Sequence, residues 1–431
     1  MLRRAFAGDP FVRRIFFVCA VFVMSWRSED LRRTWFAQVS AQALTHRGFA
    51  EARGFVFPLE TPNDGANLVG DLLARGEVFA TPKTWLQLAA GLDGRGNTHD
   101  QVERSWRLDV SDRGTHRPAL SIRRLSATLH HRRITVVAGK QFIRWGKTDI
   151  VTPTDHFAPR DFLNVVDTEF IAVTGAHAVV QAGSEMVEVV IVPRFTPSRV
   201  PLLNQRWAVL PAEAATLRLV DGGAPLPAGI QTGVRWSHMG DGYEFSLSYF
   251  EGFNHLPNIE AHVPLVPGEL VLSRVYPTAT SYGADAAIPT QWFTIKGEAA
   301  YFQSSTPATD EYVLYVLQLE RQMGEWMCVA GYAGEVVTER NAPLTFSPNR
   351  SLTRSAVGRA SYTIDANRTA AVEGAVRLNG DGVYLKAEYS QARGQHWRMT
   401  VTGSLIAGRA GDFLGQYRRN SHLSAALRYS F

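Results

Sequence analysis

The chain is poor in the features that stabilise small secreted domains and helical membrane proteins. Its 431 residues include two cysteines, Cys19 and Cys328, so a disulfide framework is excluded. The longest uncharged apolar run, Ile15 to Trp26, is shorter than the roughly 20 residues that a membrane-spanning helix needs. No linker, charge block or low-complexity tract divides the chain, which is therefore expected to form one domain over residues 44–431.

The surplus of basic residues is concentrated at the amino-terminal end. Residues 1–43 hold seven Arg and three acidic residues, which accounts for most of the formal net charge of +5. Ala41-Gln42-Ala43 is the nearest small-x-small cleavage site. Residues 1–43 are therefore expected to be a signal peptide or an atypical leader, and nucleic-acid binding is not expected of the remainder. Basic residues precede the apolar run, as in a secretory signal: Arg3, Arg4, Arg13 and Arg14.

Motifs of enzymes and cofactor sites are also missing. The sequence has no GxSxG elbow, no HExxH, no Cys/His ligand spacing and no phosphate-binding glycine pattern. His130 and His131 are adjacent, so on a strand they point to opposite faces and cannot share a metal. Asp155 and His156 could form an acid/base pair in a loop, but no nucleophile accompanies them. Neither an enzyme nor a cofactor is expected, and an outer-membrane hydrolase stays as the alternative.

Alternation of apolar and polar residues is abundant, by contrast. It is clear in 243–249, 383–390 and 397–405, and it recurs in segments of about 10 to 14 residues, roughly twice the length of strands in soluble proteins. Such strands predict an all-β fold, a transmembrane antiparallel β-barrel in which every backbone polar group is paired within the structure. In the last eleven residues one face carries Leu423, Ala425, Leu427, Tyr429 and Phe431.

The connections between these segments alternate between short and long. Transmembrane barrels have short turns on the periplasmic side and longer loops outside. Counting back from the carboxyl terminus predicts about 18 strands, with 16 as the alternative, and both termini in the periplasm. The first strand is expected over Gly48 to Phe57, the first tight turn over 81–83, and a tight turn at Gly380-Asp381 where parity requires a long loop. Arg123 and Lys140 fall out of phase, which a bulge or a strand end above the bilayer would explain.

The polar face of such a barrel would line its interior. Barrels of about 16 to 18 strands enclose a lumen too wide for side chains to fill, so charged residues there face water. A slight basic excess predicts mild anion preference, whereas opposite charges such as Glu298 and Arg235 would alternatively pair and only stiffen the wall. The candidate lumen-lining residues are Arg75, Glu77, Arg124, Arg235, Glu244, Lys296, Glu298, Arg359, Arg377, Lys386, Glu388, Arg398 and Arg428.

One long connection, within Gly139 to Asp167, combines charged, aromatic and proline residues. It begins with Gly139-Lys140-Gln141-Phe142-Ile143-Arg144-Trp145-Gly146. With the preceding strands and the terminal Phe431, this segment resembles a family of outer-membrane channels that includes porins and alginate-export-type proteins. The resemblance implies that a loop of about residues 144–168 folds inward and narrows the pore; the alternative is that the loop's charged residues tie it to the barrel rim. The candidates are Arg144, Lys147, Asp155, Arg160 and Asp161.

A terminal Phe431 two residues after Tyr429 resembles the assembly signal of bacterial outer-membrane barrels, which implies the barrel-assembly machinery as a partner. The expected function is passive diffusion of small polar or anionic solutes through a barrel surrounded by outer-membrane lipid. A closed structural or adhesive barrel is a further alternative. The Pro-rich connection 195–228 is compatible with a lid, a plug or a partner-binding surface.

Overall fold

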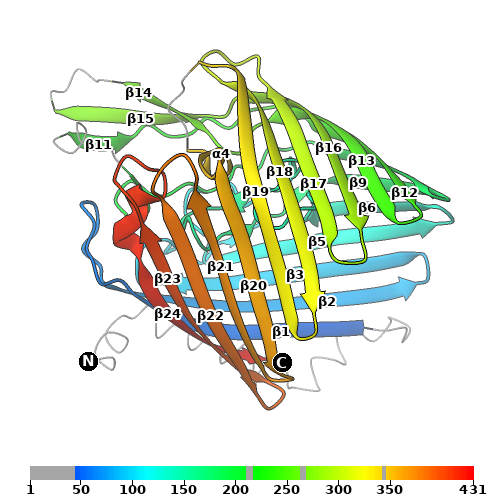
Figure 1. The fold of residues 1–431 in the computed structure, drawn as a ribbon, viewed down its shortest axis with the longest axis horizontal. Coiled ribbons are helices and arrows are strands. Elements are labelled where there is room, and N and C mark those ends of the chain that lie inside the picture. Colours follow the sequence, from blue (N-terminus) through cyan, green and yellow to red (C-terminus); the bar gives the residue numbers. More distant parts are fainter. Residues whose placement is uncertain (1–43, 210–216, 263–267, 342–345) are drawn as a thin grey trace.

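The computed structural model describes residues 44–209, 217–262, 268–341 and 346–431. In it, 18 antiparallel strands pair side by side and close on themselves as a barrel (Figure 1). The first and last strands complete the ring, and Gly48 and Phe431 exchange two backbone hydrogen bonds of 3.0 Å there. The predicted fold and strand number are therefore confirmed. The expected leader, residues 1–43, lies outside the described residues.

The barrel strands follow the chain order around the wall. The first begins at Leu44, four residues before the expected start, and the second runs through Lys83, so the first tight turn is Thr84-Trp85 and not 81–83. The strands are β1 (Leu44–Val56), β2 (Leu68–Lys83), β3 (Leu86–Asn97), β5 (Leu120–His131), β6 (Ile134–Gln141), β9 (Val173–Ala182), β10 (Glu185–Val192), β12 (Gln231–Gly240), β13 (Tyr243–Phe253), β16 (Thr278–Pro289), β17 (Thr294–Gln303), β18 (Glu311–Met323), β19 (Trp326–Glu339), β20 (Ser355–Asp365), β21 (Arg368–Arg377), β22 (Val383–Arg393), β23 (Trp397–Ala407) and β24 (His422–Ser430).

Smaller elements lie in the connections. A three-stranded sheet projects beyond one end of the barrel (Figure 1). None of the helices in the described ranges is long and apolar enough to cross a membrane. The small elements are β4 (Leu108–Asp109), the two-stranded sheet of β7 (Arg160–Asp161) and β8 (Glu169–Phe170), the three-stranded sheet of β11 (Arg218–Asp221), β15 (Glu269–Val275) and β14 (Asn258–His262), helix α4 (Pro348–Ser351) and the 3-10 helix η2 (Gly415–Asn420).

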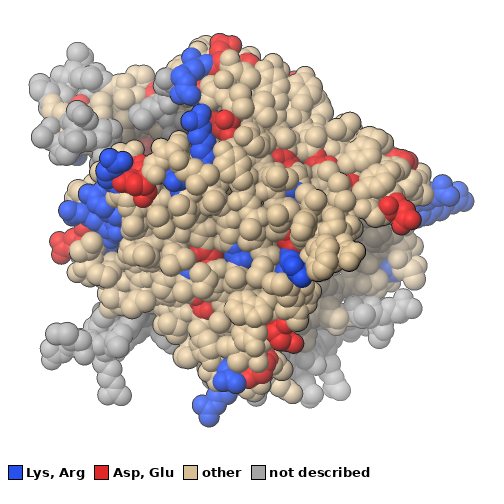
Figure 2. All heavy atoms as spheres, viewed as in Figure 1, with Lys and Arg blue, Asp and Glu red and all other residues tan. Residues whose placement is uncertain are grey.

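The barrel wall is apolar outside and polar inside. On β13, Leu247 is 52% exposed, whereas its neighbours Ser246 and Ser248 are buried. On β18, Leu317 is 54% exposed next to the buried Gln318. Figure 2 shows broad uncharged areas over one face of the wall, with most charged residues toward the ends of the barrel. This arrangement inverts that of a soluble protein and suits a wall surrounded by hydrocarbon.

Arg123 is out of phase because β5 carries a bulge at this position. Gly91 of β3 pairs with Arg124, while the next residue, Leu92, pairs with Ile122, so that Arg123 is the extra residue. The bulge brings consecutive arginines to one ring: Arg123 and Arg124 lie 4.7 and 5.5 Å from the centre of the Phe142 ring.

Lys140 is out of phase because the backbone turns at Gly139, near the end of β6. Lys140 stands opposite the exposed Leu125 in register, yet it is buried. Gly139 has a φ of +119°, and a Cβ there would lie 2.2 Å from the carbonyl oxygen of Leu125. Only glycine fits this position. The Lys140 ammonium therefore reaches the Asp112 carboxylate at 2.5 Å instead of facing lipid.

The two ends of the barrel carry connections of different length. At one end the strands are joined by turns of two to four residues, and Leu44 and Phe431 lie at this end. The long connections lie at the other end, which we call the mouth. The short connection 378–382 is also at the mouth, as the tight turn at Gly380-Asp381 predicted. The periplasmic position of the short-turn end stays a prediction.

Candidate functional site: a loop inside the barrel

The connection from β6 to β9, residues 142–172, folds into the barrel; we call it the inserted loop. Its anchor is Glu298 on β17, six strands further round the wall from β6. The buried Glu298 carboxylate accepts hydrogen bonds from the backbone N–H groups of Lys147 (2.9 Å), Thr148 (3.0 Å) and Thr154 (2.7 Å). It also accepts from the hydroxyls of Thr148 (2.8 Å) and Thr154 (2.9 Å). Charge-assisted bonds of this kind are stronger than neutral ones, so one wall carboxylate fixes the loop.

Apolar side chains pack the inserted loop against the inner wall. Trp145 and Phe157 are buried edge to face, with ring centroids 5.2 Å apart. They lie over Gly233 of β12, where a Cβ would come within 2.7 Å of Trp145. Further along the loop, Val151 is fully buried beside Leu314 of β18. The loop therefore has an apolar interface with the wall in addition to its polar anchor.

The first three candidate constriction residues are engaged within the loop or with the wall. Arg144 pairs with Asp155 at 3.1 Å. The Asp155 carboxylate also accepts hydrogen bonds from the backbone N–H groups of Trp145 (2.9 Å) and Gly146 (2.8 Å). Lys147 pairs with Glu244 of β13 at 2.7 Å and with Asp285 of β16 at 3.2 Å. These three side chains therefore stabilise the conformation of the inserted loop or attach it to the wall.

Arg160 and Asp161 are engaged in the same way at the far end of the loop. Arg160 donates to the Thr152 hydroxyl at 3.0 Å. Asp161 pairs with Arg117 at 2.8 Å and with Arg199 at 3.3 Å, which joins three separate connections. Burial alone would raise the pKa of Asp161, but these guanidinium groups hold it below its ordinary value of 3.8.

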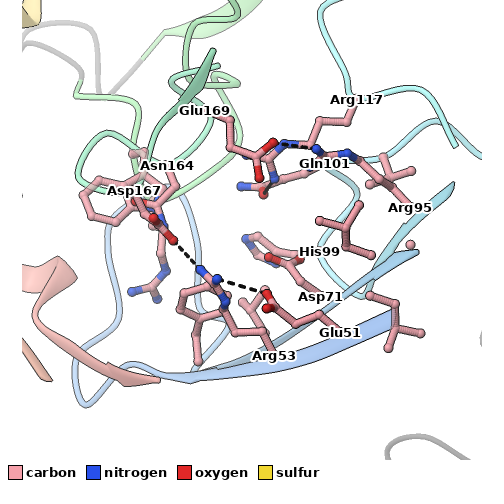
Figure 3. A pocket seen from close by; sticks show the side chains of 18 of the residues that line it. Glu51, Arg53, Asp71, Arg95, His99, Gln101, Arg117, Asn164, Asp167 and Glu169 are labelled. Carbon is pink, nitrogen blue, oxygen red and sulfur yellow. Dashed lines mark hydrogen bonds and ion pairs between the residues drawn. The ribbon is translucent and has the colours of Figure 1, made fainter. Parts of the chain in front are cut away.

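The loop returns along the first strands and leaves a cavity of about 110 Å³ between itself and the wall (Figure 3). Arg53 of β1 faces Asp167 of the loop at 2.5 Å, and Arg95 of β3 pairs with Glu169 at 2.6 Å. Charges of the two signs balance around this cavity. Its lining includes the carboxylates of Glu51, Asp71, Asp167 and Glu169 and the guanidinium groups of Arg53, Arg95, Arg117 and Arg206.

A second connection crosses the mouth. Residues 193–209, which we call the mouth strap, begin at the end of β10 and reach the wall where β1 meets β24. There the buried Trp207 packs on Tyr417, with ring centroids 5.7 Å apart. The Arg206 guanidinium lies 3.7 Å from the centre of the Phe57 ring, and its backbone oxygen accepts a hydrogen bond of 2.9 Å from Asn420. The mouth strap therefore links two opposite parts of the barrel rim, and the choice between a lid, a plug and a partner-binding surface for 195–228 stays a prediction.

The candidate lumen residues differ in their partners. Arg235 pairs with Asp285 and not with Glu298. Four candidates contact the inserted loop: Glu298 and Glu244 as described above, Arg75 through Glu169 (3.5 Å) and Lys296 through Asp149 (3.8 Å). Seven have ion-pair partners elsewhere: Arg75 with Asp93 (2.7 Å), Glu77 with Arg47 (2.7 Å), Arg235 with Asp285 (2.9 Å), Lys296 with Glu320 (2.5 Å), Arg377 with Asp412 (2.9 Å), Lys386 with Glu373 (3.4 Å) and Arg428 with Glu51 (2.6 Å). Within the described ranges, four of the candidate lumen residues form no ion pair: Arg124, Arg359, Glu388 and Arg398.

The charged cavity residues that sequence reasoning missed include Glu51, Arg53, Arg117 and Glu169. Glu51 and Arg53 alternate on β1 with Ala50 and Ala52, so the phase of that strand would have found them. Arg117 and Glu169 lie in connections, where alternation carries no information about position. Their presence at the cavity depends on how the loops fold back, which no local pattern encodes.

Asp155 and His156, the acid/base pair that the sequence allows, are each engaged in other contacts. Asp155 is occupied by backbone donors, and the ring of His156 stacks on Phe250 at 5.0 Å. Burial lowers the pKa of His156 to about 4. Across the described ranges, no group of three or more His, Cys, Asp or Glu side chains could hold a metal ion.

A closed 18-stranded barrel that is apolar outside, charged inside and occupied by an inserted loop has the architecture of a porin-type β-barrel. Solved porins have this fold. The chain is similar to OccAB4 of Acinetobacter baumannii (TM-score 0.53, 9% identity, 91% of this chain and 99% of that one) and to a BenF-like porin of Pseudomonas fluorescens Pf-5 (TM-score 0.54, 8% identity, 90% and 98%). The chain is also similar to OpdQ of Pseudomonas aeruginosa, with a TM-score of 0.50 and 8% identity over 90% of this chain and 98% of that one. No family model and no curated protein sequence matches the chain.

Proposed function

We propose that the chain is a channel of the bacterial outer membrane through which small polar or anionic solutes diffuse passively past the inserted loop. The observation that carries this proposal is the anchoring of that loop on Glu298, inside a barrel whose inner face is polar. A loop fixed in the bore narrows a path for water and solutes and requires no energy coupling. The porin fold supports the same function.

The contacts at the loop support separate roles for the residues that hold it and for those that line the passage. The five candidate constriction residues hold the loop in place, and the narrow passage runs beside β1, β2 and β3, through the cavity that Arg53 and Asp167 share. A larger hollow of about 2100 Å³ at the mouth is lined by eight Arg and two acidic residues. Its charge supports the preference for anions.

The test is conduction by the purified full chain. In planar bilayers we expect discrete conductance steps, and in liposome swelling we expect faster entry of small organic acids than of uncharged sugars of the same size. Uronates extend the panel to larger anions. Absence of conduction through correctly folded barrels would favour a closed structural barrel. Hydrolysis of lipid or peptide that is lost in His156→Ala would favour the enzyme alternative.

We also propose that the chain contacts outer-membrane lipid through its apolar wall and the barrel-assembly machinery through its last strand. Phe431 and Tyr429 stand at the closure of the barrel, where Tyr429 packs on Trp397 with ring centroids 5.0 Å apart. Phe431→Ala is expected to reduce the amount of barrel assembled in cells and to leave refolding in detergent micelles unchanged. Equal assembly of both proteins in cells would refute the role of this residue.

A further inference from the structure

The ion pair between Arg53 and Asp167 spans the cavity of Figure 3, from the wall to the inserted loop. Arg53 Nη1 and Asp167 Oδ2 lie 2.5 Å apart. The side chains of Arg53 and Asp167 are 31% and 41% exposed, whereas those of Arg75 and Asp93 nearby are 14% and 4% exposed. The pair across the cavity is therefore much more accessible to water than the pair within the wall.

The two partners are anchored unequally. Arg53 also contacts Glu51 at 3.0 Å, and Glu51 in turn contacts Arg428 at 2.6 Å, so the guanidinium is fixed to the wall by a second carboxylate. Asp167 forms no other ion pair among the described residues. When the pair opens, Glu51 still holds Arg53 beside the passage as a cation, while the Asp167 carboxylate keeps no ion-pair partner in the described ranges.

We propose that the Arg53–Asp167 pair determines the ion selectivity of the channel and closes the narrowest part of its passage. This inference rests on the proposed function. With both residues present their charges cancel, and the passage itself adds little to the preference for anions that the mouth provides. Loss of either residue leaves one uncompensated charge at the passage, and such charges set the preference of a pore for anions or cations.

The experiment measures the ratio of chloride to potassium permeability, from the reversal potential of the full chain in planar bilayers under a potassium chloride gradient. Asp167→Asn is expected to raise this ratio by a factor of about five, the size expected of one uncompensated charge a few ångström from the path. Arg53→Gln is expected to lower it by a similar factor. The double variant is expected to return to the wild-type ratio with a higher conductance.

Asp365→Asn is the matched control, because Asp365 is also 41% exposed and paired with an arginine, Arg368 at 2.6 Å, but lies at the end of β20, beside a tight turn at the other end of the barrel. It is expected to leave the permeability ratio unchanged. If the wild type conducts and Asp167→Asn matches this control, the inference is wrong. If the wild type does not conduct, the proposed function itself is wrong.

A second experiment modifies a single thiol chemically in channels that are already folded. Asp167→Cys, with Cys19→Ser and Cys328→Ser, places one thiol at the passage. A negatively charged methanethiosulfonate reagent is expected to lower the ratio of chloride to potassium permeability, and a positively charged one to raise it. Equal effects of the two reagents, or no reaction, would overturn the inference even if Asp167→Asn assembles poorly.

Discussion

Glu298 of the barrel wall binds Thr154 of the inserted loop twice. The Glu298 carboxylate accepts a hydrogen bond of 2.7 Å from the backbone N–H of Thr154 and one of 2.9 Å from the Thr154 hydroxyl. Glu298→Ala is expected to release the inserted loop, because each buried donor left without a partner costs about 1 to 3 kcal/mol. Single-channel recording should then show a larger and noisier conductance. Glu388→Ala is the control, since Glu388 forms no ion pair in the described ranges, and equal conductance of the two variants would contradict the anchoring role.

Gly139→Ala is expected to destabilise the barrel at the end of β6. The left-handed backbone at Gly139 and the nearby Leu125 carbonyl leave no room for a Cβ. We expect a loss of about 2 kcal/mol or more in the free energy of unfolding, measured by denaturant titration in detergent micelles. Gly297→Ala, where a Cβ would meet nothing within 4 Å, is the matched control. Identical unfolding midpoints for the two variants would refute the strain argument.

Acid is expected to detach the loops only at low pH. Because the pKa of Asp161 is lowered in the folded protein, its ion pairs contribute fully above the ordinary value of 3.8 and are lost as the pH falls through the lower folded-state value. Resistance of the inserted loop to an acid-active protease should therefore persist at about pH 5 and fall below about pH 3. Asp161→Asn should reduce the resistance already at about pH 5. Loss of wild-type resistance between about pH 5 and 6 would contradict this prediction.

Trp207→Ala is expected to loosen the mouth strap. The buried indole is one of the strap's main contacts with the opposite wall, and truncation of a buried tryptophan costs about 3 to 5 kcal/mol. Limited proteolysis should cut within 193–209 at a higher rate, and channel recordings should show longer open periods. Trp292→Ala, at a position that is 60% exposed on a tight turn, should change neither property. A strap equally protected in both variants would show that Trp207 does not hold it.

The fold follows from local pattern, because hydrocarbon outside and water inside select opposite faces of every strand. Leu247 and Ser248 show this rule at adjacent positions. Even the exceptions have local causes, since the bulge at Arg123 and the turn at Gly139 explain the two residues out of phase.

The site was predictable only in part. Glu298 is identifiable as an inward charge on a strand, but its hydrogen-bond donors are 144 to 151 residues away in the sequence. The same holds for Asp167, whose partner Arg53 is 114 residues away. Such contacts depend on the path of the loop through the bore, which is determined by the complete barrel. The sequence pattern therefore locates the charged residues on the inner wall and leaves their pairing open.

The position of Arg53 on β1 has a consequence for biogenesis. β1 is the strand that joins β24 to seal the ring, and the returning part of the inserted loop reaches both Arg53 and the strands beside it. The loop cannot complete its contacts while that seam is open, so the bore is expected to reach its final width only after the last strand has been added. A nascent barrel would thus be leakier than the mature one, and sealing of the seam would coincide with the onset of selectivity.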